Sequence, residues 1–592
     1  MKILMSASSS RGGGGHHSHT PSSSTLGSSS KERSKSPAPS SRSTSPPSPP
    51  IGFASLTPQL SKQKLGSGNR RTSIETTISN ISRKASSVSK VGIERRELPI
   101  SKRGGAKHSI QDTPRTAVSP TSRLILPTSK HTVTYANTIP DIIKKKRNGE
   151  RLFPDEIMLF VKSIVEQSIQ QAQIGAMLMA IYLRGMNTDE TVAMTRALIH
   201  TGSILSWPEE WRRLVVDKHS TGGIGDKTSL ILAPILAVPM IASTAMELSG
   251  TMLEKLQSIP GIRVNLTPLE MRSVLHTVGC CITSEYSELL PADQVIYKNR
   301  ELTSTVDSPP LIIASVMSKK AAEGLAALVL DIKYGRGSFM KSKEEARNLA
   351  YAMVNMGYKM GIKTSALLSS MDSPVGNTIG NALEVAEALQ CLKGHDKADL
   401  KELATKLGGE LLYLLSATTR KEGADIINKI MREGTALQKF KDMIVAQGVR
   451  SDIANRLCDP RTDVWSVLPR APHVTALSSQ ASGYVHYIDA LELGRVAHKL
   501  GAGRSKPKDP VYSNVGLELQ VHVGSSILKG VLYNSVIEAG CLTMICVVGQ
   551  VWVRVHHIHN ELGENFISHI QKALIVRPTE IIVSHARVTE II

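Results

Sequence analysis

The interpretation of this chain starts from residues 215–229, which read Val215-Val216-Asp217-Lys218-His219-Ser220-Thr221-Gly222-Gly223-Ile224-Gly225-Asp226-Lys227-Thr228-Ser229. The apolar run 214–216 is typical of the end of a buried strand, and the apolar run 230–236 is typical of a helix. Glycines between a strand and a helix let backbone N–H groups approach an anion in front of the helix N-terminus. Because two lysines and four hydroxyls also lie in or beside this turn, it predicts a phosphate-binding loop.

The loop differs from two familiar phosphate-binding motifs. A Walker loop has its lysine directly after a glycine, whereas here Asp226 separates Gly225 from Lys227. The G-x-G-x-x-G motif is also absent, because Thr228 stands where the third glycine belongs. The glycines alone would fit an ordinary strand–helix turn, but the Lys-His-Ser triplet before them favours a functional loop.

Residues 1–134 differ in composition from the rest of the 592-residue chain. They hold 21 lysines and arginines against 5 acidic residues, while the remainder is nearly neutral, with 50 against 46. Their Ser/Pro-rich sequence without periodicity predicts a disordered tail, which we favour over a nucleic-acid-binding surface. Ser-Pro steps and the Arg70-Arg71-Thr72-Ser73 site predict that the tail is phosphorylated. An Arg/Ser-rich leader also fits a mitochondrial presequence, although no amphipathic helix is evident.

Composition also narrows the class of protein. The longest apolar stretch of the core, 230–242, contains two prolines and is too short to span a membrane. Six cysteines without a C-x-x-C pair favour a reducing, cytoplasmic location and disfavour a zinc site. The adjacent Cys280 and Cys281 are expected in the core.

The periodicity predicts an α/β fold with three parts after the tail. A small helical domain is expected over 135–205, with a return segment near 292–322. An α/β phosphate-binding domain is expected over 206–468, because strand and helix patterns alternate there. A C-terminal α+β domain is expected over 469–592. The strands expected in the α/β domain are Val238–Ala242, Leu311–Ile313, Ala327–Ile332 and Thr364–Leu368.

Four further motifs follow the phosphate loop in order: Tyr297-Lys298-Asn299-Arg300-Glu301-Leu302-Thr303-Ser304-Thr305-Val306-Asp307-Ser308, Ile313-Ala314-Ser315-Val316-Met317-Ser318-Lys319-Lys320, Asp331-Ile332-Lys333-Tyr334-Gly335 and Gly501-Ala502-Gly503-Arg504. With the loop, they closely resemble the thymidine phosphorylases of the pyrimidine nucleoside phosphorylase family. The resemblance covers roughly three quarters of the chain, from about Ile139 onward, and leaves out the tail. It implies reversible phosphorolysis of thymidine to thymine and 2-deoxyribose 1-phosphate. It also implies a homodimer, with phosphate as co-substrate and neither metal nor organic cofactor.

The resemblance assigns four residues to the pyrimidine: His219, Arg300, Ser315 and Lys319. It assigns three to phosphate: Lys218, Ser220 and Ser229. Of the pyrimidine set, the three candidate catalytic residues are His219, Arg300 and Lys319. Cleavage of an N-glycosidic bond leaves negative charge on the departing pyrimidine, which cations and N–H donors stabilise. Taken singly, such an arginine or lysine is more often a solvated surface charge, and such a histidine more often has a structural role. The spacing of the set nevertheless favours a functional role for these residues.

Two segments depart from the family pattern. The family's second glycine-rich loop corresponds to residues 242–252, where its two phosphate-binding hydroxyls fall on Ala242 and Met252. Ser243 and Thr251 lie one residue away and are the candidates to replace them, provided that the backbone shifts. Losing both donors would lower the rate about 10⁴-fold if the effects added. Residues 531–549 are an apparent apolar insert, either an extra strand pair or, as we favour, an unspliced segment.

The altered loop leaves an alternative open, a relative that binds pyrimidine nucleosides but turns them over poorly. An altered transcript would give the same pattern. Another alternative is a scaffold protein whose basic tail carries the function. The fold alone would also fit phosphoribosyl transfer to an aromatic amine, but the set at 300, 315 and 319 favours a pyrimidine. The choice between thymidine and uridine stays open.

Overall fold

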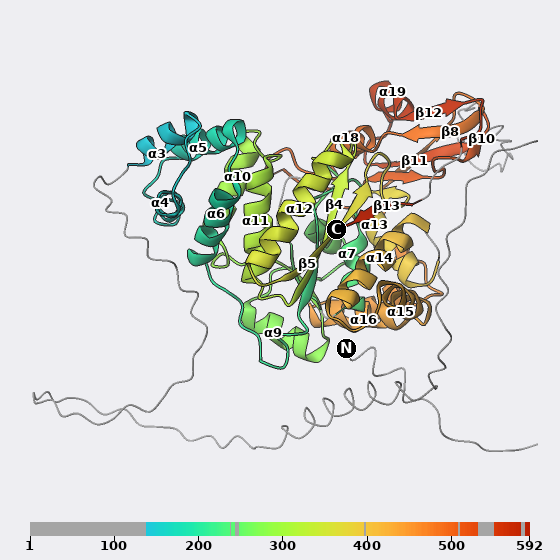
Figure 1. The fold of residues 1–592 in the computed structure, drawn as a ribbon. Coiled ribbons are helices and arrows are strands. Elements are labelled where there is room, and N and C mark those ends of the chain that lie inside the picture. Colours follow the sequence, from blue (N-terminus) through green and yellow to red (C-terminus); the bar gives the residue numbers. More distant parts are fainter. Residues whose placement is uncertain are drawn as a thin grey trace, which may run out of the picture. The chain divides into compact units, whose positions relative to one another are not determined.

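The computed structural model describes residues 138–236, 238–242, 248–395, 398–506, 509–530, 550–581 and 586–592 (Figure 1). The predicted tail, the candidate phosphate ligand Ser243 and the apparent insert 531–549 therefore lie outside the described residues. Within the described ranges, no helix is both long enough and apolar enough to cross a bilayer.

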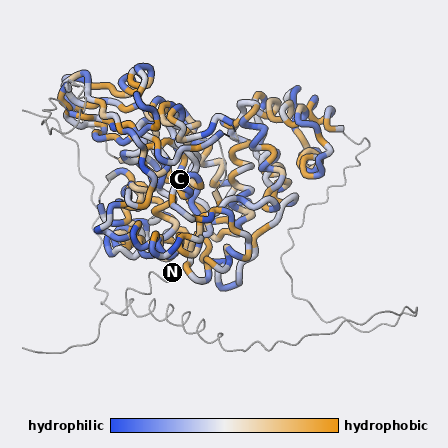
Figure 2. The backbone as a smooth tube through the Cα atoms, turned by 180° about the vertical axis from the view of Figure 1, so that it is seen from behind, coloured by the Kyte–Doolittle hydropathy of each residue, from blue (hydrophilic) through white to orange (hydrophobic). Residues whose placement is uncertain are grey.

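The chain first forms a group of helices: α3 (Ile139–Arg147), α4 (Pro154–Val165), α5 (Gln171–Arg184) and α6 (Thr188–His200). Proline at the first position of α4 suits a helix start. The cap of α6 is Asn187, whose side chain accepts the Glu190 N–H. Two later helices, α10 (Pro291–Leu302) and α11 (Pro309–Ala322), pack against this group. Figure 2 shows hydrophobic and hydrophilic residues interspersed along these helices.

The main sheet has the strand order β1 (Val216–Ser220), β4 (Ala327–Tyr334), β5 (Lys363–Ser370) and β13 (Val588–Ile591). The first three strands are parallel, and β13 joins β5 antiparallel. Seven of the eight residues of β4 are fully buried, as expected for a central strand with both faces covered. A separate parallel pair is formed by β2 (Pro239–Ala242) and β3 (Cys281–Ser284). Cys280 and Cys281 are buried, as the sequence predicted.

One predicted strand is wrong. Leu311–Ile313 lies inside α11, which begins with Pro309 and packs against both α6 and α12 (Lys343–Lys359). A helix segment that is buried on all sides presents a short, continuous apolar run, and such a run cannot be distinguished from a buried strand by periodicity. The strands predicted at 238–242, 327–332 and 364–368 are confirmed as β2, β4 and β5.

Helices α7 (Thr228–Ile235), α8 (Met252–Gln257) and α9 (Pro268–Thr277) follow the first strands, and α13 (Asn381–Leu392) follows β6 (Thr378–Ile379). Four more complete this part: α14 (Ala398–Leu414), α15 (Arg420–Arg432), α16 (Thr435–Ala446) and α17 (Ser451–Cys458). In Figure 1, α14, α15 and α16 lie together to the right of β5. Helix α7 packs against α13, α14 and α16, so the start of α7 is held by buried neighbours.

The C-terminal part contains two small antiparallel sheets. One has the order β6, β9 (Gly516–Leu519), β11 (Val551–His557) and β7 (His473–Ser478). The other has the order β10 (Ser526–Ile527), β8 (Gly483–Ile488) and β12 (Leu574–Arg577). Helices α18 (Ala490–Leu500) and α19 (Glu564–Lys572) pack against each other beside them, after the short 3₁₀ turn η1 (Val464–Ser466). The predicted α/β fold, with a helical part and a C-terminal α+β part, is confirmed.

Candidate active site

The Lys-His-Ser triplet lies at the carboxyl end of β1. His219 is in register with Leu330 of β4, and Ser220 with Asp331. The sequence predicted that the strand ends at Val216, but the strand begins there, because parallel pairing with β4 extends through the polar triplet. In open α/β sheets, ligands bind beyond the carboxyl ends of parallel strands. The triplet therefore occupies the edge at which this fold places ligands.

Lys218 is buried in a network of charges with the glycine-rich turn. Its Nζ donates to Thr228 Oγ1 across 2.8 Å and lies 3.4 Å from the Asp226 carboxylate. Burial alone would raise the pKa of Asp226, but the ammonium groups of Lys218 and Lys333, with a hydrogen bond from the Thr228 hydroxyl, hold it well below its ordinary value. Asp226 is therefore ionised, and it pairs with Lys218, one of the residues predicted to bind phosphate.

The start of α7 completes this group. Asp226 Oδ1 accepts the backbone N–H of Thr228 across 3.1 Å, and Ser229 follows as the second residue of the helix. The side chain of Ser229 is buried, with an exposed fraction of 7%. The positive end of the α7 dipole lies at these residues, where it favours a bound anion. The structure thus brings Lys218, Ser220 and Ser229 to one loop.

Three of the four residues predicted to bind the base, Arg300, Ser315 and Lys319, lie on α10 and α11. Ser315 and Lys319 are one helical turn apart, and Lys319 Nζ lies 3.3 Å from Ser315 Oγ. Arg300 is buried and donates to the backbone carbonyls of Val306 and Leu311. The ring of Tyr297 lies below both cations, 5.3 Å from the Arg300 guanidinium and 5.5 Å from Lys319 Nζ. The structure therefore brings Arg300, Ser315 and Lys319 together.

Two carboxylates hold Lys319 in place. Its Nζ lies 2.9 Å from Asp293 and 3.1 Å from Glu285, and Ser315 Oγ donates to Asp293 across 3.0 Å. Sequence reasoning missed both carboxylates and also Tyr297. Asp293 and Tyr297 lie seven and three residues before Arg300, so helical spacing places them on its face. That signal could have found them, whereas Glu285 follows β3 in a loop and carries no such signal.

The imidazole of His219 is affected by charges from both the phosphate loop and the base-binding residues. Burial lowers the pKa of the imidazole well below 6.5, and the positive charges of Lys320, Lys319 and Lys218 lower it further. Lys320 is itself fixed by Asp217 at 2.5 Å and by Glu323 at 2.7 Å. At neutral pH the ring is therefore uncharged and can donate one N–H bond.

Thr251 is the only one of the two substitute phosphate ligands that the structure describes. It caps α8: its Oγ1 accepts the Glu254 N–H at 3.3 Å, and its own N–H donates to Glu254 Oε2 at 2.7 Å. The hydroxyl proton is not used in this capping box, so the hydroxyl can still donate to an anion. Whether Thr251 binds phosphate stays a prediction.

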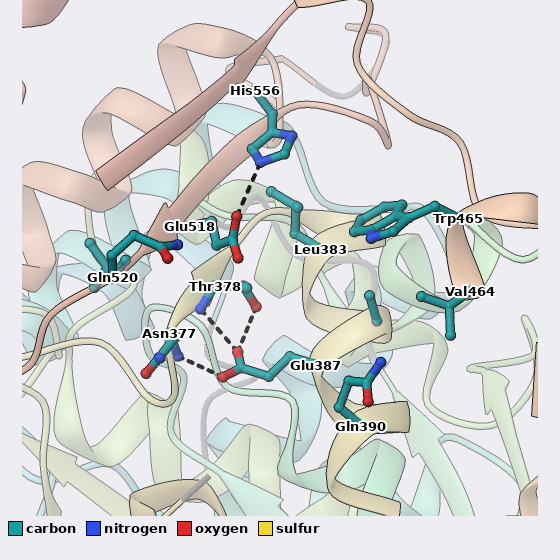
Figure 3. Close-up of a pocket in the computed structure, with 12 residues that line it drawn as sticks. Asn377, Thr378, Leu383, Glu387, Gln390, Val464, Trp465, Glu518, Gln520 and His556 are labelled. Atoms are coloured by element: carbon teal, nitrogen blue, oxygen red, sulfur yellow. Dashed lines mark hydrogen bonds and ion pairs between the residues drawn. The ribbon is translucent and has the colours of Figure 1, made fainter. Parts of the chain in front are cut away.

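A cavity of about 320 Å³ lies elsewhere, between η1, α13, β9 and β11 (Figure 3). Its lining includes Leu383, Trp465, Glu518 and His556, and none of the predicted site residues lines it. The candidate active site is therefore defined by converging side chains and not by this cavity.

Comparison with known proteins places these features in a family. Residues 140–202 match the helical bundle domain of the glycosyl transferase family, and residues 212–437 match its a/b domain. Residues 484–533 match the pyrimidine nucleoside phosphorylase C-terminal domain.

Curated relatives agree with the domain matches. Human thymidine phosphorylase is 46% identical over 66% of this chain and 83% of its own length. Pyrimidine-nucleoside phosphorylase from Geobacillus stearothermophilus is 39% identical over 66% of this chain and 89% of its own. Thymidine phosphorylase from Mycobacterium tuberculosis (strain H37Rv) is 39% identical over 67% and 89%. The fold and domain matches define a glycosyl transferase. More narrowly, the chain belongs to the thymidine phosphorylase and pyrimidine nucleoside phosphorylase family, which confirms the resemblance seen in its motifs.

Proposed function

We propose that this protein is a pentosyltransferase that catalyses the reversible phosphorolysis of thymidine. Thymidine and phosphate give thymine and 2-deoxyribose 1-phosphate. The observation that supports this most directly is the set of Arg300, Ser315 and Lys319 around Tyr297, together with the anion-binding loop at the end of β1. Phosphate is a co-substrate, and the proposed reaction uses no metal or organic cofactor.

The base-binding group suits the departing pyrimidine. When the N1–C1′ bond breaks, its electron pair stays on the base and the charge spreads to the carbonyl oxygens. Arg300 and Lys319 place positive charge at these oxygens, Ser315 can bond the N3/O4 edge, and neutral His219 can donate to O2 as its charge grows. These hydrogen bonds and charge contacts strengthen as the N1–C1′ bond breaks, so they stabilise the transition state more than they stabilise the bound substrate.

The loop group suits the attacking phosphate. Lys218, Ser220 and Ser229 supply an ammonium and two hydroxyls, and the start of α7 adds backbone N–H groups. A hydrogen phosphate oxygen bonds to C1′ while the pyrimidine leaves, and the proton of the phosphate is transferred to the pyrimidine. Charge and atoms then balance without any further reactant.

We also propose that the protein works as a homodimer. Exposed apolar side chains of the helical group support this: Met179, Tyr182 and Leu183 on α5, and Leu302 at the end of α10. Leu183 and Leu302 are 70% and 74% exposed, and α10 packs against α5. Apolar groups in such positions are typical of protein–protein contacts. Light scattering on the purified full chain, beside a Leu183→Glu variant, tests this part of the proposal.

The location is proposed to be cytoplasmic. Burial raises the pKa of the Cys280 thiol to about 12, and Cys281 beside it is also a free, buried thiol. Such unpaired thiols suit a reducing compartment.

Release of thymine from thymidine by the purified full chain, with and without phosphate, tests the function. Arg300→Ala is the control, and uridine assayed in parallel compares the two nucleosides. We expect release that depends on phosphate and is lost in the control. A folded protein that binds thymidine but releases no thymine would reject the proposed reaction in favour of a nucleoside-binding relative. Release without phosphate would indicate hydrolysis instead.

A further inference from the structure

Lys255 on α8 connects three separate segments. Its side chain is buried, with an exposed fraction of 1%. The ammonium lies 3.0 Å from the carbonyl oxygen of Gly250, 3.3 Å from that of Asp226 and 3.1 Å from the Glu384 carboxylate. Asp226 belongs to the phosphate loop, Gly250 to the end of the altered second loop, and Glu384 to α13. One ammonium thus joins both loops to a common helix.

The residues beside Lys255 also have little freedom to move. Gly250 has a φ of +86°, and a β-carbon there would lie 2.1 Å from Asn381 Oδ1 and 2.9 Å from the Ala502 carbonyl. Asn381 Nδ2 donates to that same carbonyl across 2.8 Å. Glu254 pairs with Arg504 at 2.9 Å. The segment 250–255 is therefore fixed on one side by α13 and on the other by residues 502–504.

A second ion pair holds the phosphate loop to the same helix. Glu387 lies one turn after Glu384 on α13 and pairs with Lys227 at 2.6 Å. Lys227 Nζ also donates to the carbonyls of Val375 and Thr378, and Figure 3 shows Thr378 bonded to Glu387. Successive turns of α13 thus hold an ammonium from the phosphate loop and one from the helix that follows the second loop.

We propose that Lys255 is a positioning residue that fixes the described end of the second loop, residues 248–252, against the phosphate loop and thereby sets the geometry of the phosphate site. This inference rests on the proposed function. The physical reason is the direct bonding of one ammonium to a backbone carbonyl in each loop. Moving Gly250 or Asp226 would break a bond that no water can replace in a fully buried position, so these two residues keep one separation.

Stability alone does not account for this arrangement. A buried ion pair is often no more stable than apolar residues of the same volume, because both charges must be desolvated. Two of the partners of Lys255 are main-chain carbonyls of loops, and neither lies in a regular helix or strand. A residue that only stabilised α8 would not need the carbonyl of Asp226, which lies 29 residues earlier in the sequence.

The test compares steady-state kinetics of three full-length variants. Lys255→Met removes the ammonium and keeps the chain length. Lys255→Met/Glu384→Gln also removes the carboxylate that would otherwise lose its partner, so it retains the fold if the single variant does not. Lys406→Met is the matched control, because Lys406 pairs with Glu402 at 2.6 Å on α14 and neither residue bonds a loop of the site.

In both Lys255 variants, we expect kcat/KM for phosphate to fall on the order of 10–100-fold, with most of the change in the phosphate KM. The thymidine KM is expected to stay within about twofold of wild type, because the base-binding residues lie on other helices. Calorimetric titration with inorganic phosphate should show the same loss without any need for turnover.

The outcomes separate the two proposals. If the wild type releases no thymine, the proposed function fails, while the calorimetric comparison still tests Lys255. If the wild type is active and the double variant has the phosphate KM of the Lys406→Met control, the inference on Lys255 is overturned. Equal rises in the phosphate and thymidine KM values would also overturn it, because they would indicate a general loss of structure.

Discussion

Lys319 and Asp293 form a buried ion pair of 2.9 Å between α11 and α10. Burial alone would lower the pKa of the Lys319 ammonium, but the carboxylates of Asp293 and Glu285 raise it above its ordinary value. Lys319 is therefore charged at neutral pH. Its three protons are directed by Asp293, Glu285 and the Ser315 hydroxyl, so the cation is oriented before substrate binds.

Replacing Lys319 tests this orientation. Lys319→Met should lower kcat/KM for thymidine about 10²–10³-fold, the usual effect of losing one oriented donor to a charge that develops in the transition state. Asp293→Asn should lower it as well, since the ammonium loses its closest carboxylate. Lys429→Met, which removes an exposed lysine of α15, is the control and should leave kcat/KM unchanged. Near-normal turnover by Lys319→Met would remove Lys319 from the catalytic residues.

The charge state of His219 gives a second prediction. Because its pKa lies well below 6.5, the ring acts as a neutral donor. His219→Gln keeps a neutral N–H donor, so it should retain more of kcat than His219→Ala, for which we expect a loss of about 10²-fold or more. Near pH 6.5, the pH profile of kcat/KM should therefore be the same in the wild type and in His219→Gln. Equal losses in the two variants would contradict a simple donor role.

The same shift predicts a dependence of stability on pH. In the unfolded chain His219 takes up its proton near pH 6.5, whereas in the folded protein it does so only at lower pH. As the pH falls below 6.5, the unfolded state therefore binds more protons than the folded state. The free energy of unfolding decreases as a result. His219→Gln lacks this contribution. The melting temperature of the wild type should fall more between pH 7.5 and pH 5.5 than that of the variant.

Much of the fold could be predicted from local patterns, because the strands and helices that form it have the expected periodicity. The predictions that failed concern segments whose secondary structure depends on tertiary contacts. Strand β1 includes the polar Lys218 and His219 because β4 pairs with them in parallel register. The 311–313 run is helical because α11 is covered on several sides, so its apolar residues do not follow an amphipathic period.

Prediction of the candidate site also failed where contacts depend on the tertiary fold. Arg300, Ser315 and Lys319 were found because their spacing resembles a family, and the structure brings them together. Glu285 could not be found in this way, since it lies in a loop and reaches Lys319, 34 residues later in the sequence, only through the tertiary fold. The contacts of Lys255 with Asp226 and Glu384 join residues that are far apart in the sequence, and no local pattern indicates them.

Thr251 can be tested for two roles separately. Thr251→Ala should lower the free energy of unfolding by about 0.5–2 kcal/mol, because α8 loses its capping side chain. Thr251→Asn keeps an acceptor for the Glu254 N–H and should retain stability, but it lacks the hydroxyl. If the hydroxyl binds phosphate, both variants will raise the phosphate KM. An unchanged phosphate KM in Thr251→Asn would leave Thr251 as a helix cap only.

The last prediction concerns Arg587, which lies directly before β13. Its buried guanidinium donates to the carbonyls of Ser370, Ser373 and Pro374, at 2.8, 2.9 and 2.7 Å, and to the Asp399 carboxylate at 2.6 Å.

Arg587→Met leaves these acceptors without their donor, so we expect a loss of about 3 kcal/mol in the free energy of unfolding, measured with urea. Arg450→Met is the control: Arg450 is an exposed partner of Asp452, and its loss should cost less than about 1 kcal/mol. Burial raises the pKa of Asp399, but Arg587 outweighs it and lowers the pKa, so the contribution of this pair is present above about pH 4 and is lost on acidification below it. Equal stability of the two variants would show that the guanidinium is not needed to hold the 370–374 turn against the last strand.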